Sequence, residues 1–262
     1  MKLSIVVLNY KSKNLIKYLL KRALSFKLPW HWEIIVVDND SRDKIGELID
    51  LNFPVVKFIQ SKRNIGMGGG NNLGIKESHG EYILIANPDI TLNEKAVIEM
   101  VDFLDKNERA GVAGPRILNP DKTIQETCFR WPNFFTFLYR RTFLGRTKKG
   151  RESLYYFSYQ DIDLSQNRQV DWVLGGCLMI RAKALQDTGV FDDRFFLFLE
   201  DTDLCRRMWQ KDWQVWYLAK AEVIHLPHRL SQNEGSLGSF FSKLTWVHLS
   251  SWAKYFWKWR SK

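Results

Sequence analysis

The first hundred residues alternate between continuous apolar stretches and segments with helical periodicity, and this alternation most constrains the fold. Continuous apolar stretches predict strands that are buried on both faces, and the intervening segments predict amphipathic helices. The predicted strands are Lys2–Asn9, Glu33–Asp38, Val55–Ile59 and Tyr82–Ala86. Strands separated by helices in this way form a mostly parallel sheet with helices on both faces, so the sequence predicts an α/β fold.

Cap residues and apolar stripes define two of the predicted helices. Ser12 is placed to cap the first helix, and Asn93 is placed to cap a later one. The two apolar stripes are Leu15, Ile16, Leu19, Leu20 and Ala23, and then Val97, Met100, Val101 and Leu104. A short helix is also expected at Leu73–Ser78. The stretch from Asn119 to Gln169 has no clear period, so it is expected to be irregular.

Polar side chains follow three of these strands where each strand ends. Asn9, then Asp38 and Asn39, then Asn87 and Asp89 occupy these positions. Because ligands of open α/β sheets bind at the carboxyl ends of the strands, these side chains predict a ligand site at one sheet edge. Each acid also has a structural interpretation, since Asn-Pro-Asp is a turn signal and an Asp there can cap the next helix.

The run Asn64–Gly74, "NIGMGGGNNLG", holds four glycines within five residues. Glycines allow a backbone to approach a ligand closely, so Asn64, Gly66, Gly69 and Asn71 are candidate ligand contacts. A dinucleotide-binding GxGxxG fingerprint that begins at Gly66 fails, because Asn71 occupies the sixth place, and the cluster follows the third strand instead of the first. A plain flexible loop is the alternative.

Three acids, Glu200, Asp201 and Asp203, stand directly before a predicted helix and after the apolar run "RFFLFL". N-capping and compensation of the helix dipole would account for one or two of them. Apolar surroundings also raise the pKa of a carboxyl group toward that of a general base. His225 follows a later strand. It is a structural histidine in the simplest interpretation, and it could share a divalent ion with Asp89.

The net charge of +10 is concentrated in two aromatic segments. Residues 127–151 hold seven Lys/Arg and residues 235–262 hold five, and neither segment has an acid. The remainder has 27 basic and 29 acidic residues, so it is close to neutral. Such patches suit an anionic surface, either phospholipid or nucleic acid.

Residues 236–262 are predicted to form an amphipathic, basic and aromatic helical tail at a membrane interface, separate from a domain that covers residues 1–235. Two polar residues, His248 and Ser251, interrupt the apolar stripe of this helix. The alternative to a membrane contact is a helix that docks on the domain or forms a homodimer contact. The stripe residues are Phe240, Phe241, Leu244, Val247, Trp252, Tyr255, Phe256 and Trp259. No apolar stretch approaches the roughly 20 residues of a membrane-spanning helix, and no signal peptide precedes the first strand.

Taken together, the motifs resemble family 2 glycosyltransferases of the GT-A fold, a Rossmann-like α/β fold, and within them the rhamnosyltransferase-like branch. The resemblance covers about Lys2 to Ser231. One departure follows His225, where the family usually has a glycine and this chain has His228 and Arg229. The stretches that carry it are "SIVVLNY", "IIVVDNDSRD", "NIGMGGGNNLGI", "ILIANPDI", "WVLGGCLMIR", "GVFDDRFFLFLEDTDLCRRM" and "VIHLPHRLS".

The resemblance implies a role for each candidate residue. Asp201 corresponds to the catalytic base, with Glu200 as a neighbour that orients the loop or contacts the acceptor. Asp89, the last acid of "NPD", and His225 would hold Mg²⁺ or Mn²⁺ against the donor diphosphate. The other substrate-binding candidates are Asn9, Asp38, Asn39, Asn64, Gly66, Gly69, Asn71, Asn87, Trp172, Gly175, Gly176 and Arg207.

An inverting transfer of L-rhamnose from dTDP-L-rhamnose is the implied reaction, with a UDP-sugar as the alternative donor. The implied acceptor is a glycan, carried on a lipid diphosphate at the inner face of the plasma membrane. Such a protein would be cytoplasmic and peripheral on an anionic membrane, and three cysteines without a CxxC pair fit a reducing compartment.

Two further alternatives remain open. A sugar nucleotidyltransferase would need a glycine-rich loop with a lysine after the first strand, and Asn9 to Ser12 contains no glycine. A non-catalytic nucleic-acid-binding protein would use the basic aromatic patches. It would leave the acids Asp38, Asp89 and Asp201 without a purpose, so no nucleic acid partner is expected.

Overall fold

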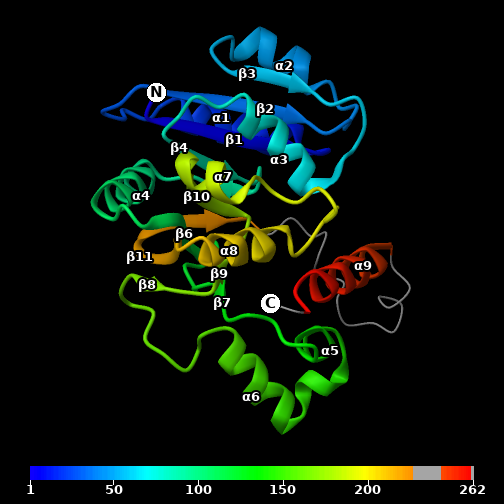
Figure 1. The fold of residues 1–262 in the computed structure, drawn as a ribbon. Coiled ribbons are helices and arrows are strands. Elements are labelled where there is room, and N and C mark those ends of the chain that lie inside the picture. Colours follow the sequence, from blue (N-terminus) through cyan, green and yellow to red (C-terminus); the bar gives the residue numbers. More distant parts are fainter. Residues whose placement is uncertain (227–242, 261–262) are drawn as a thin grey trace.

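The structure, a computed structural model, describes residues 1–226 and 243–260 of the chain. Its first half alternates strands and helices as the sequence predicts, and the sheet it builds lies in the middle of the molecule (Figure 1). The elements of this half are β1 (Leu3–Asn9), α1 (Lys13–Ala23), β2 (Trp32–Asp38), α2 (Ile45–Asn52), β3 (Lys57–Gln60), α3 (Gly66–Lys76), β4 (Tyr82–Ala86), β5 (Ile90–Thr91), α4 (Glu94–Lys106) and β6 (Ala110–Leu118).

The second half contains shorter elements before it rejoins the sheet. Its middle was expected to be irregular, and the structure corrects this, because two helices and a 3₁₀ turn lie there. The elements are β7 (Cys128–Phe129), α5 (Thr136–Arg141), η1 (Phe143–Arg146), α6 (Lys148–Phe157), β8 (Arg168–Gln169), β9 (Trp172–Val173), β10 (Cys177–Arg181), α7 (Ala182–Thr188), α8 (Glu200–Gln210), β11 (Gln214–His225) and α9 (Lys243–Lys258).

The main sheet has the strand order β3-β2-β1-β4-β10-β6-β11-β5, with β8 paired to β11. Strands β3, β2, β1 and β4 pair in parallel, and β6 pairs in parallel with β11. The inserted strand β10 pairs antiparallel with both β4 and β6. This mostly parallel α/β sheet has the architecture that the sequence predicts.

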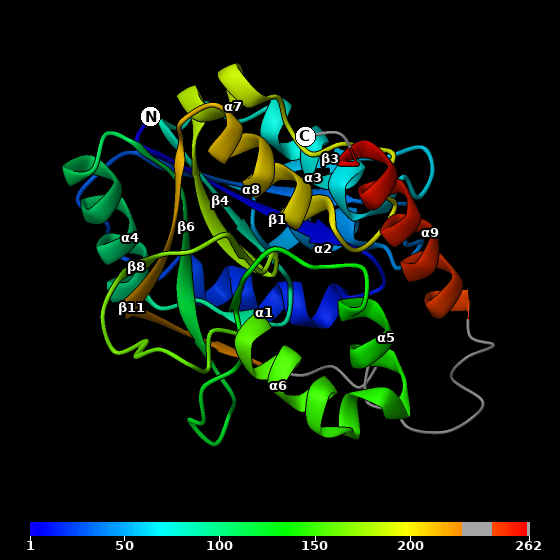
Figure 2. The ribbon, with the colours of Figure 1, turned by 60° about the horizontal axis from the view of Figure 1, so that its bottom comes forward.

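Alternation along the strands separates two cores on the faces of the sheet. Leu3, Ile5 and Val7 of β1 pack with α1, α2 and α4 on one face. Val6 packs on the opposite face, in a core that includes α7 and α8. The helices on either face are visible in Figure 2. Because strands are buried on both faces, their sequences are continuously apolar.

Two helix starts differ in detail from the prediction. Ser12 makes no side-chain cap; its backbone N–H donates to Asn9 Oδ1 at 3.0 Å instead. Asn93 caps α4 as predicted, because its Oδ1 accepts from the Lys95 N–H at 3.0 Å. Helix α3 begins at Gly66, which corrects the later start expected near Leu73.

The C-terminal helix α9 packs on the domain, so the structure supports the docked-helix alternative. Tyr255 and Trp259 are buried against Phe195. The polar interruptions of the stripe also have partners: Ser251 Oγ donates to the Leu197 carbonyl at 2.8 Å, and His248 Nδ1 lies 2.9 Å from an Arg141 nitrogen. Phe240, Phe241 and the predicted domain boundary at residue 235 lie outside the described residues.

No helix within residues 1–226 and 243–260 is long and apolar enough to cross a membrane. Cys128, Cys177 and Cys205 are all buried free thiols, as the absence of a pairing pattern predicts. Burial raises the pKa of each thiol to about 12, so none of them ionises near neutral pH.

Candidate active site

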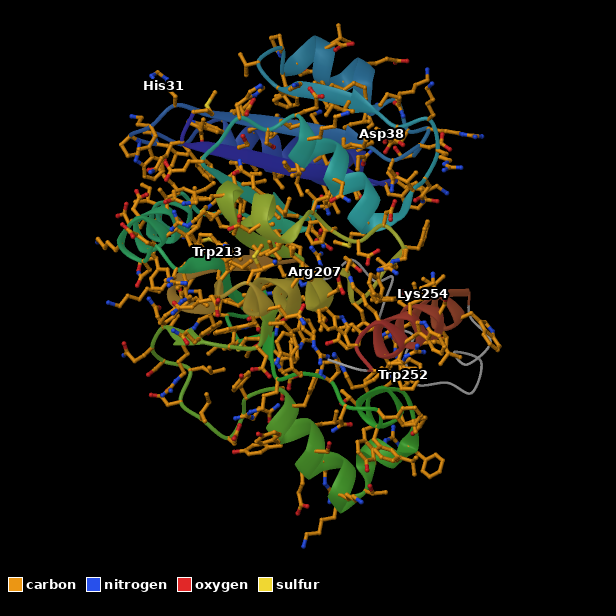
Figure 3. All side chains as sticks on the ribbon, in the orientation of Figure 1. His31, Asp38, Arg207, Trp213, Trp252 and Lys254 are labelled. Atoms are coloured by element: carbon orange, nitrogen blue, oxygen red, sulfur yellow. The ribbon has the colours of Figure 1, made fainter. Side chains whose placement is uncertain are left out.

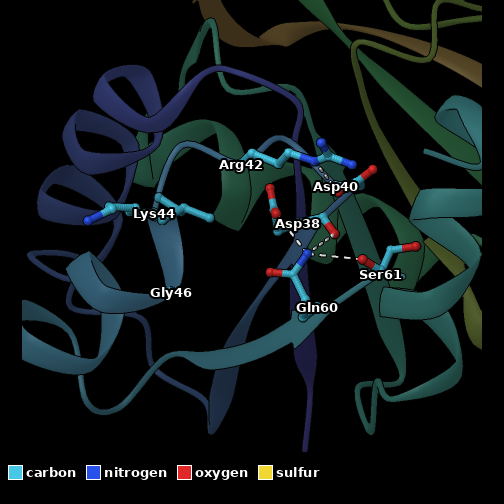
Figure 4. A pocket seen from close by; sticks show the side chains of 8 residues that line it. Asp38, Asp40, Arg42, Lys44, Gly46, Gln60 and Ser61 are labelled. Atoms are coloured by element: carbon cyan, nitrogen blue, oxygen red, sulfur yellow. Dashed lines mark hydrogen bonds and ion pairs between the residues drawn. The ribbon is translucent and has the colours of Figure 1, made fainter. Parts of the chain in front are cut away.

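A cleft of about 410 Å³ lies at the carboxyl ends of β2 and β3. Asp38 ends β2 and Gln60 ends β3, and Gln60 Nε2 donates to Asp38 Oδ2 at 2.9 Å (Figure 4). The loop after β2 supplies Asp40, Arg42 and Lys44, each with a φ near +60°. Strained backbone of this kind is typical of ligand-binding loops, so the cleft is a candidate nucleoside site.

Asn9 and Asn39 support the cleft from beneath instead of facing it. Asn9 is fully buried, and its Nδ2 donates to Asp38 Oδ1 at 2.7 Å and to Ser41 Oγ at 2.6 Å. Asn39 Nδ2 donates to Asn64 Oδ1 and to the Gly66 carbonyl, both at 3.0 Å. The side chains predicted to touch substrate at Asn9 and Asn39 therefore position Asp38 and the glycine-rich segment.

Helix α3 packs its glycine-rich start against the loop that precedes α8. Gly66 has a φ of +83°, and a Cβ there would lie 2.3 Å from the Phe196 carbonyl oxygen. The Met67 N–H donates to that same oxygen at 2.7 Å. Gly69 and Asn64 line a second cleft of about 410 Å³ beside this contact. Only glycine fits at Gly66, and the reason in the structure is its contact with the Phe196 backbone; a contact between Gly66 and substrate stays a prediction.

Glu200 and Asp201 form the first turn of α8, directly after two strained residues. Phe198 and Leu199 have φ values of +70° and +68°, a region that bulky side chains avoid. Glu200 is buried, and its Oε2 has no hydrogen-bond partner among the described residues. Burial, with the charge of Asp201 added, raises the pKa of Glu200 to about 8.

Asp201 is held by backbone donors that point at its carboxylate. Oδ2 accepts from the Gly175 N–H at 2.8 Å, and Oδ1 accepts from the Thr202 N–H at 2.7 Å. Burial raises the pKa of Asp201 as well, and these hydrogen bonds oppose the rise. Two adjacent buried acids with raised pKa values favour proton transfer near neutral pH, which is the property of a general base.

The turn Gly175–Gly176 joins the acids of α8 to the end of β4. Gly175 bonds Asp201, and the Gly176 carbonyl accepts from the Asn87 N–H at 2.8 Å. Asn87 is two residues before Asp89. The turn Gly175–Gly176 therefore contacts both the predicted base, Asp201, and the segment that carries the predicted metal ligand, Asp89. The turn lies at the start of β10, which runs antiparallel and so begins at the edge where β4 ends.

Asp89 and His225 lie together at this edge, as the sequence predicts. Asp89 Oδ2 is 3.2 Å from His225 Nε2, and Asp89 Oδ1 is buried with no partner among the described residues. His225 Nδ1 lies 2.9 Å from Gln125 Oε1. Because Gln125 Nε2 donates to Asn119 Oδ1 at 2.6 Å, its Oε1 is free to accept the Nδ1–H of His225.

This pairing fits a divalent cation. With a proton on Nδ1, a neutral His225 directs the lone pair of Nε2 at the carboxylate, and a cation between them removes the repulsion. The described residues contain no cluster of three His, Cys, Asp or Glu side chains that could hold a metal alone. The remaining ligands would therefore come from phosphate oxygens and water, as is usual for Mg²⁺ beside a diphosphate.

Two predicted contacts are engaged elsewhere in the protein. Trp172 is 5 % exposed, stacks on Phe129 at 4.6 Å and donates from Nε1 to the Arg130 carbonyl. Arg207 lies on α8 (Figure 3) and bonds Asp203 Oδ2 at 2.9 Å. Its Nη1 donates to the Thr188 carbonyl, and its Nη2 donates to the Val190 carbonyl. Contact of the Trp172 or Arg207 side chain with substrate stays a prediction that these packing contacts do not support.

Asn71 is buried, and its Oδ1 has no partner among the described residues, so it keeps an unused acceptor. Two residues that the sequence analysis missed, Gln60 and Gln125, also shape the site, together with Asn72 of the glycine-rich run. Gln60 bonds Asp38, Gln125 bonds His225, and Asn72 bonds the Phe191 backbone from both its amide atoms. A glutamine carries no local signal in a sequence, but Asn72 lies within the quoted glycine-rich run.

Residues 4–189 match the sequence model of the family described as Glycosyl transferase family 2, so the chain belongs to that family. It is a glycosyltransferase. The chain is 25 % identical over 269 residues to N-acetylglucosaminyl-diphospho-decaprenol L-rhamnosyltransferase of Mycobacterium tuberculosis, covering 98 % of this chain and 86 % of that protein. It is 24 % identical over 260 residues to rhamnosyltransferase WbbL of Escherichia coli, covering 96 % and 91 %.

Solved structures of glycosyltransferases share the fold. TarS of S. aureus, residues 1–349, superposes with a TM-score of 0.60 at 17 % identity, covering 86 % of this chain and 60 % of that chain. The mannosyltransferase PcManGT of Pyrobaculum calidifontis, in complex with GDP-Man and Mn²⁺, gives 0.60 at 14 % identity, covering 88 % and 58 %. The GT-A-like fold predicted from the sequence is confirmed.

Proposed function

We propose that this glycosyltransferase transfers L-rhamnose from dTDP-L-rhamnose to a hydroxyl group of a lipid-diphosphate-linked glycan, with inversion at the anomeric carbon. The observation that carries this proposal is the turn Gly175–Gly176, which bonds Asp201 on one side and Asn87, two residues before Asp89, on the other. The L-rhamnosyltransferase of M. tuberculosis, whose name specifies a diphospho-decaprenol acceptor, supports the sugar and the kind of acceptor.

The donor nucleotide lies across the strand ends. Asp38 and Gln60 contact the base in the cleft at β2 and β3, and the segment Asn64–Asn71 borders the nucleoside and sugar. A UDP-sugar is the second candidate donor, because TarS has also been solved in complex with UDP-GlcNAc and shares this fold. Both donors carry an uncharged pyrimidine ring, and they differ in its C5 methyl group, in the ribose 2′-hydroxyl and in the transferred sugar.

Asp89 and His225 would hold a divalent cation beside the donor diphosphate. When bound, Mg²⁺ or Mn²⁺ would supply positive charge to offset the negative charge that develops on the departing diphosphate. The unpartnered Asp89 Oδ1 and the Nε2 lone pair of His225 support this assignment. Gln125 keeps His225 in the tautomer that directs Nε2 toward the cation.

Asp201 accepts the proton of the acceptor hydroxyl as its oxygen forms the bond to the anomeric carbon. The bond from that carbon to the diphosphate breaks on the opposite side, so a single displacement inverts the centre. Hydrogen bonds from Gly175 and Thr202 orient the carboxylate, and Glu200 beside it keeps a proton because its pKa is raised to about 8. Near neutral pH Glu200 is therefore the uncharged member of the pair.

Asp201→Asn tests the assignment of the base. We expect transfer to fall about 10²–10⁴-fold while the Kd for dTDP-L-rhamnose stays near the wild-type value. Transfer is measured by release of dTDP with an N-acetylglucosaminyl-diphosphate acceptor, and the anomer of the product is read by NMR. Normal turnover of this variant, or a product of retained configuration, would contradict the mechanism.

A matched substitution and a chelation arm complete the test. Asp212→Asn removes an exposed carboxylate in the turn that follows α8, and it should leave the rate of transfer unchanged. Excess EDTA should weaken donor binding, and Mn²⁺ should restore it. Full activity in EDTA would remove the cation from the mechanism, and stabilisation by UDP-sugars but not by dTDP-L-rhamnose would select the second donor.

A further inference from the structure

The structure reverses which face of α9 is available to a partner. The aromatic stripe faces the domain, where Tyr255 is fully buried and Trp259 nearly so. Lys258 Nζ bonds Asp192 Oδ2 and Asp203 Oδ1, both at 2.7 Å, which fixes the helix on this side. Any surface contact made by α9 must therefore use its opposite face.

That opposite face presents two tryptophans to solvent. Trp246 is 61 % exposed and Trp257 is 71 % exposed. Eleven residues separate them, which is about three turns of helix, so both side chains leave the same face. Ser250 and Ala253, also exposed, lie between them. Large exposed indoles on one face are unusual for a surface that meets only water.

The segment that leads into α5 packs beside α9, against the aromatic stripe and not against the face of Trp246 and Trp257. The ring of Phe134 lies 4.7 Å from the ring of Trp252, and an Arg141 nitrogen lies 2.9 Å from His248 Nδ1. These contacts place α5 next to α9 (Figures 1 and 2). We call the exposed set the aromatic rim: Phe134, Phe135, Phe143, Trp246 and Trp257.

Positive charge accompanies the aromatic rim. Residues 127–151, which include β7, α5, the 3₁₀ turn η1 and the first residues of α6, contain seven Lys/Arg and no acid. The side chains among these that stand exposed are Arg140, Arg146, Lys148, Lys149 and Arg151. An aromatic and basic surface without acids is complementary to a layer of anionic headgroups with apolar chains beneath it.

The rim also lies beside the catalytic residues. Ser251 of α9 donates to the Leu197 carbonyl at 2.8 Å, and Leu197 is three residues before Glu200. Lys254 of α9 donates to the Arg194 carbonyl of the same loop at 2.8 Å. A bilayer that contacts the rim would therefore lie next to the loop that carries the proposed base.

We propose that the aromatic rim is a docking surface for an anionic lipid bilayer, with the indoles of Trp246 and Trp257 at headgroup level. The proposal rests on the proposed function, because a lipid-diphosphate acceptor reaches Asp201 only from a bilayer. It places the enzyme as a peripheral protein at the inner face of the plasma membrane.

Vesicle flotation of the full chain tests the rim. The wild type should float with vesicles of phosphatidylglycerol and phosphatidylcholine, and far less with phosphatidylcholine alone. The double variant Trp246→Ser/Trp257→Ser should lose about 10-fold or more in apparent affinity for the anionic vesicles. The matched control Leu51→Ser/Val55→Ser removes two apolar side chains that are 83 % and 75 % exposed at the β3 edge, and should float like the wild type.

A charge variant separates anionic lipid from apolar adhesion. Lys148→Gln/Lys149→Gln should weaken flotation about 10-fold, and Lys17→Gln/Lys21→Gln on α1 should not. Circular dichroism melts of every variant establish that the fold is intact. Equal flotation of the rim variant and the wild type, or no flotation of the wild type, would overturn the proposal.

Two readouts keep this test independent of the catalytic assignment. Transfer to a water-soluble N-acetylglucosaminyl-diphosphate acceptor should be equal in the rim variant and the wild type, while transfer to a long-chain acceptor in vesicles falls. Light scattering without vesicles reports the oligomeric state. If the rim variant converts a wild-type homodimer to a monomer and both float equally, the rim is a dimer contact and the bilayer proposal is wrong.

Discussion

Glu200 and Asp201 are adjacent carboxyl groups enclosed at the first turn of α8. Backbone N–H groups bond Asp201, whereas Glu200 Oε2 has no partner among the described residues. A buried oxygen without a partner costs folding free energy, on the order of 1–3 kcal/mol. This destabilising feature lies at Glu200, where the motif resemblance places the catalytic acids, and destabilising features of this kind are typical of functional sites.

Glu200→Gln should make the protein more stable at alkaline pH. An unfolded chain ionises Glu200 near 4.5, but the folded chain keeps the proton until about pH 8. Between these values the folded state binds more protons, so the wild-type free energy of unfolding falls as pH rises through this window. We expect the variant to gain about 4 kcal/mol at pH 8 and little below pH 4.5. Urea denaturation at pH 5, 6.5 and 8 measures this.

The control for this prediction is Glu108→Gln, which changes an exposed glutamate after α4 and should follow the wild-type slope. If the wild type and Glu200→Gln have the same pH dependence, Glu200 ionises normally in the folded protein. The claim that Glu200 keeps its proton beside Asp201 near neutral pH would then be wrong.

Gln125→Leu should weaken cation binding without loss of a direct ligand. The variant removes the acceptor that holds the Nδ1–H of His225, so the imidazole no longer has a fixed tautomer. Loss of such a supporting contact typically lowers metal affinity about 10–100-fold. Titration of Mn²⁺ in the presence of dTDP, followed by electron paramagnetic resonance, measures the affinity. Gln210→Leu, at the exposed end of α8, is the control, and equal affinities would remove Gln125 from the site.

At the scale of elements, α9 fixes the position of α8. Asp203 is fully buried two residues after Asp201, and it accepts from Arg207 Nε at 2.9 Å, Lys258 Nζ at 2.8 Å and Trp259 Nε1 at 3.0 Å. The last two donors come from α9. A buried carboxylate with several donors is stable only while they remain, so α9 is part of the support of the catalytic turn.

Lys258→Met should therefore destabilise the protein and slow transfer. The variant removes the ammonium group that bonds both Asp192 and Asp203, so we expect a loss of about 1–3 kcal/mol in the free energy of unfolding. We also expect kcat to fall while the Kd for the donor, whose nucleoside is proposed to bind at β2 and β3, changes little. Lys254→Met removes only a bond to a backbone carbonyl and is the control. Equal effects of the two variants would contradict a specific role for Lys258.

At the scale of the whole molecule, the proposed nucleotide site and the proposed membrane-docking surface lie on different elements. The candidate nucleoside cleft lies at β2 and β3, whereas the aromatic rim lies on α9 and around α5. Nucleotide binding and docking should therefore respond separately to solution conditions. Docking that depends on the seven basic residues of the acid-free segment should be electrostatic, and electrostatic attraction between exposed charges is screened by salt.

Raising NaCl from 0.1 to 0.5 M should release the wild-type protein from anionic vesicles while changing dTDP affinity much less. The Debye length falls from about 10 Å to about 4 Å over this range, so the headgroup field no longer reaches the rim. Flotation and calorimetric titration of dTDP at both salt concentrations measure the two effects. Flotation that is unchanged at 0.5 M would indicate that the rim binds through apolar contacts alone.

The sequence predicted the sheet well because strands buried on both faces must be continuously apolar. It placed the start of α3 too late, because glycine disfavours helices in isolation. In the protein those glycines allow α3 to lie close to the sheet: a Cβ on Gly74 would be 2.3 Å from Val6 Cγ1. Packing of α3 against the sheet determines where this helix begins, and a local sequence pattern does not show contacts between segments that are distant in the chain.

The site was predictable where its residues end strands or begin helices. Asp38, Asp89 and Asp201 have such positions, whereas Gln60 and Gln125 act only through partners that folding brings near. The orientation of α9 was missed for a similar reason. Its helical period was visible in the sequence, but a stripe that packs on Phe195 and one that enters a membrane have the same composition.

The insertion of β10 between β4 and β6 has a consequence for synthesis on the ribosome. Tyr82–Ala86 of β4 pairs with Cys177–Arg181, so a nascent chain that has emerged only as far as β6 leaves this side of β4 unpaired. An open apolar edge is a template for aggregation. That edge stays open until about sixty more residues have emerged, and truncations that end before residue 177 should accumulate as insoluble material.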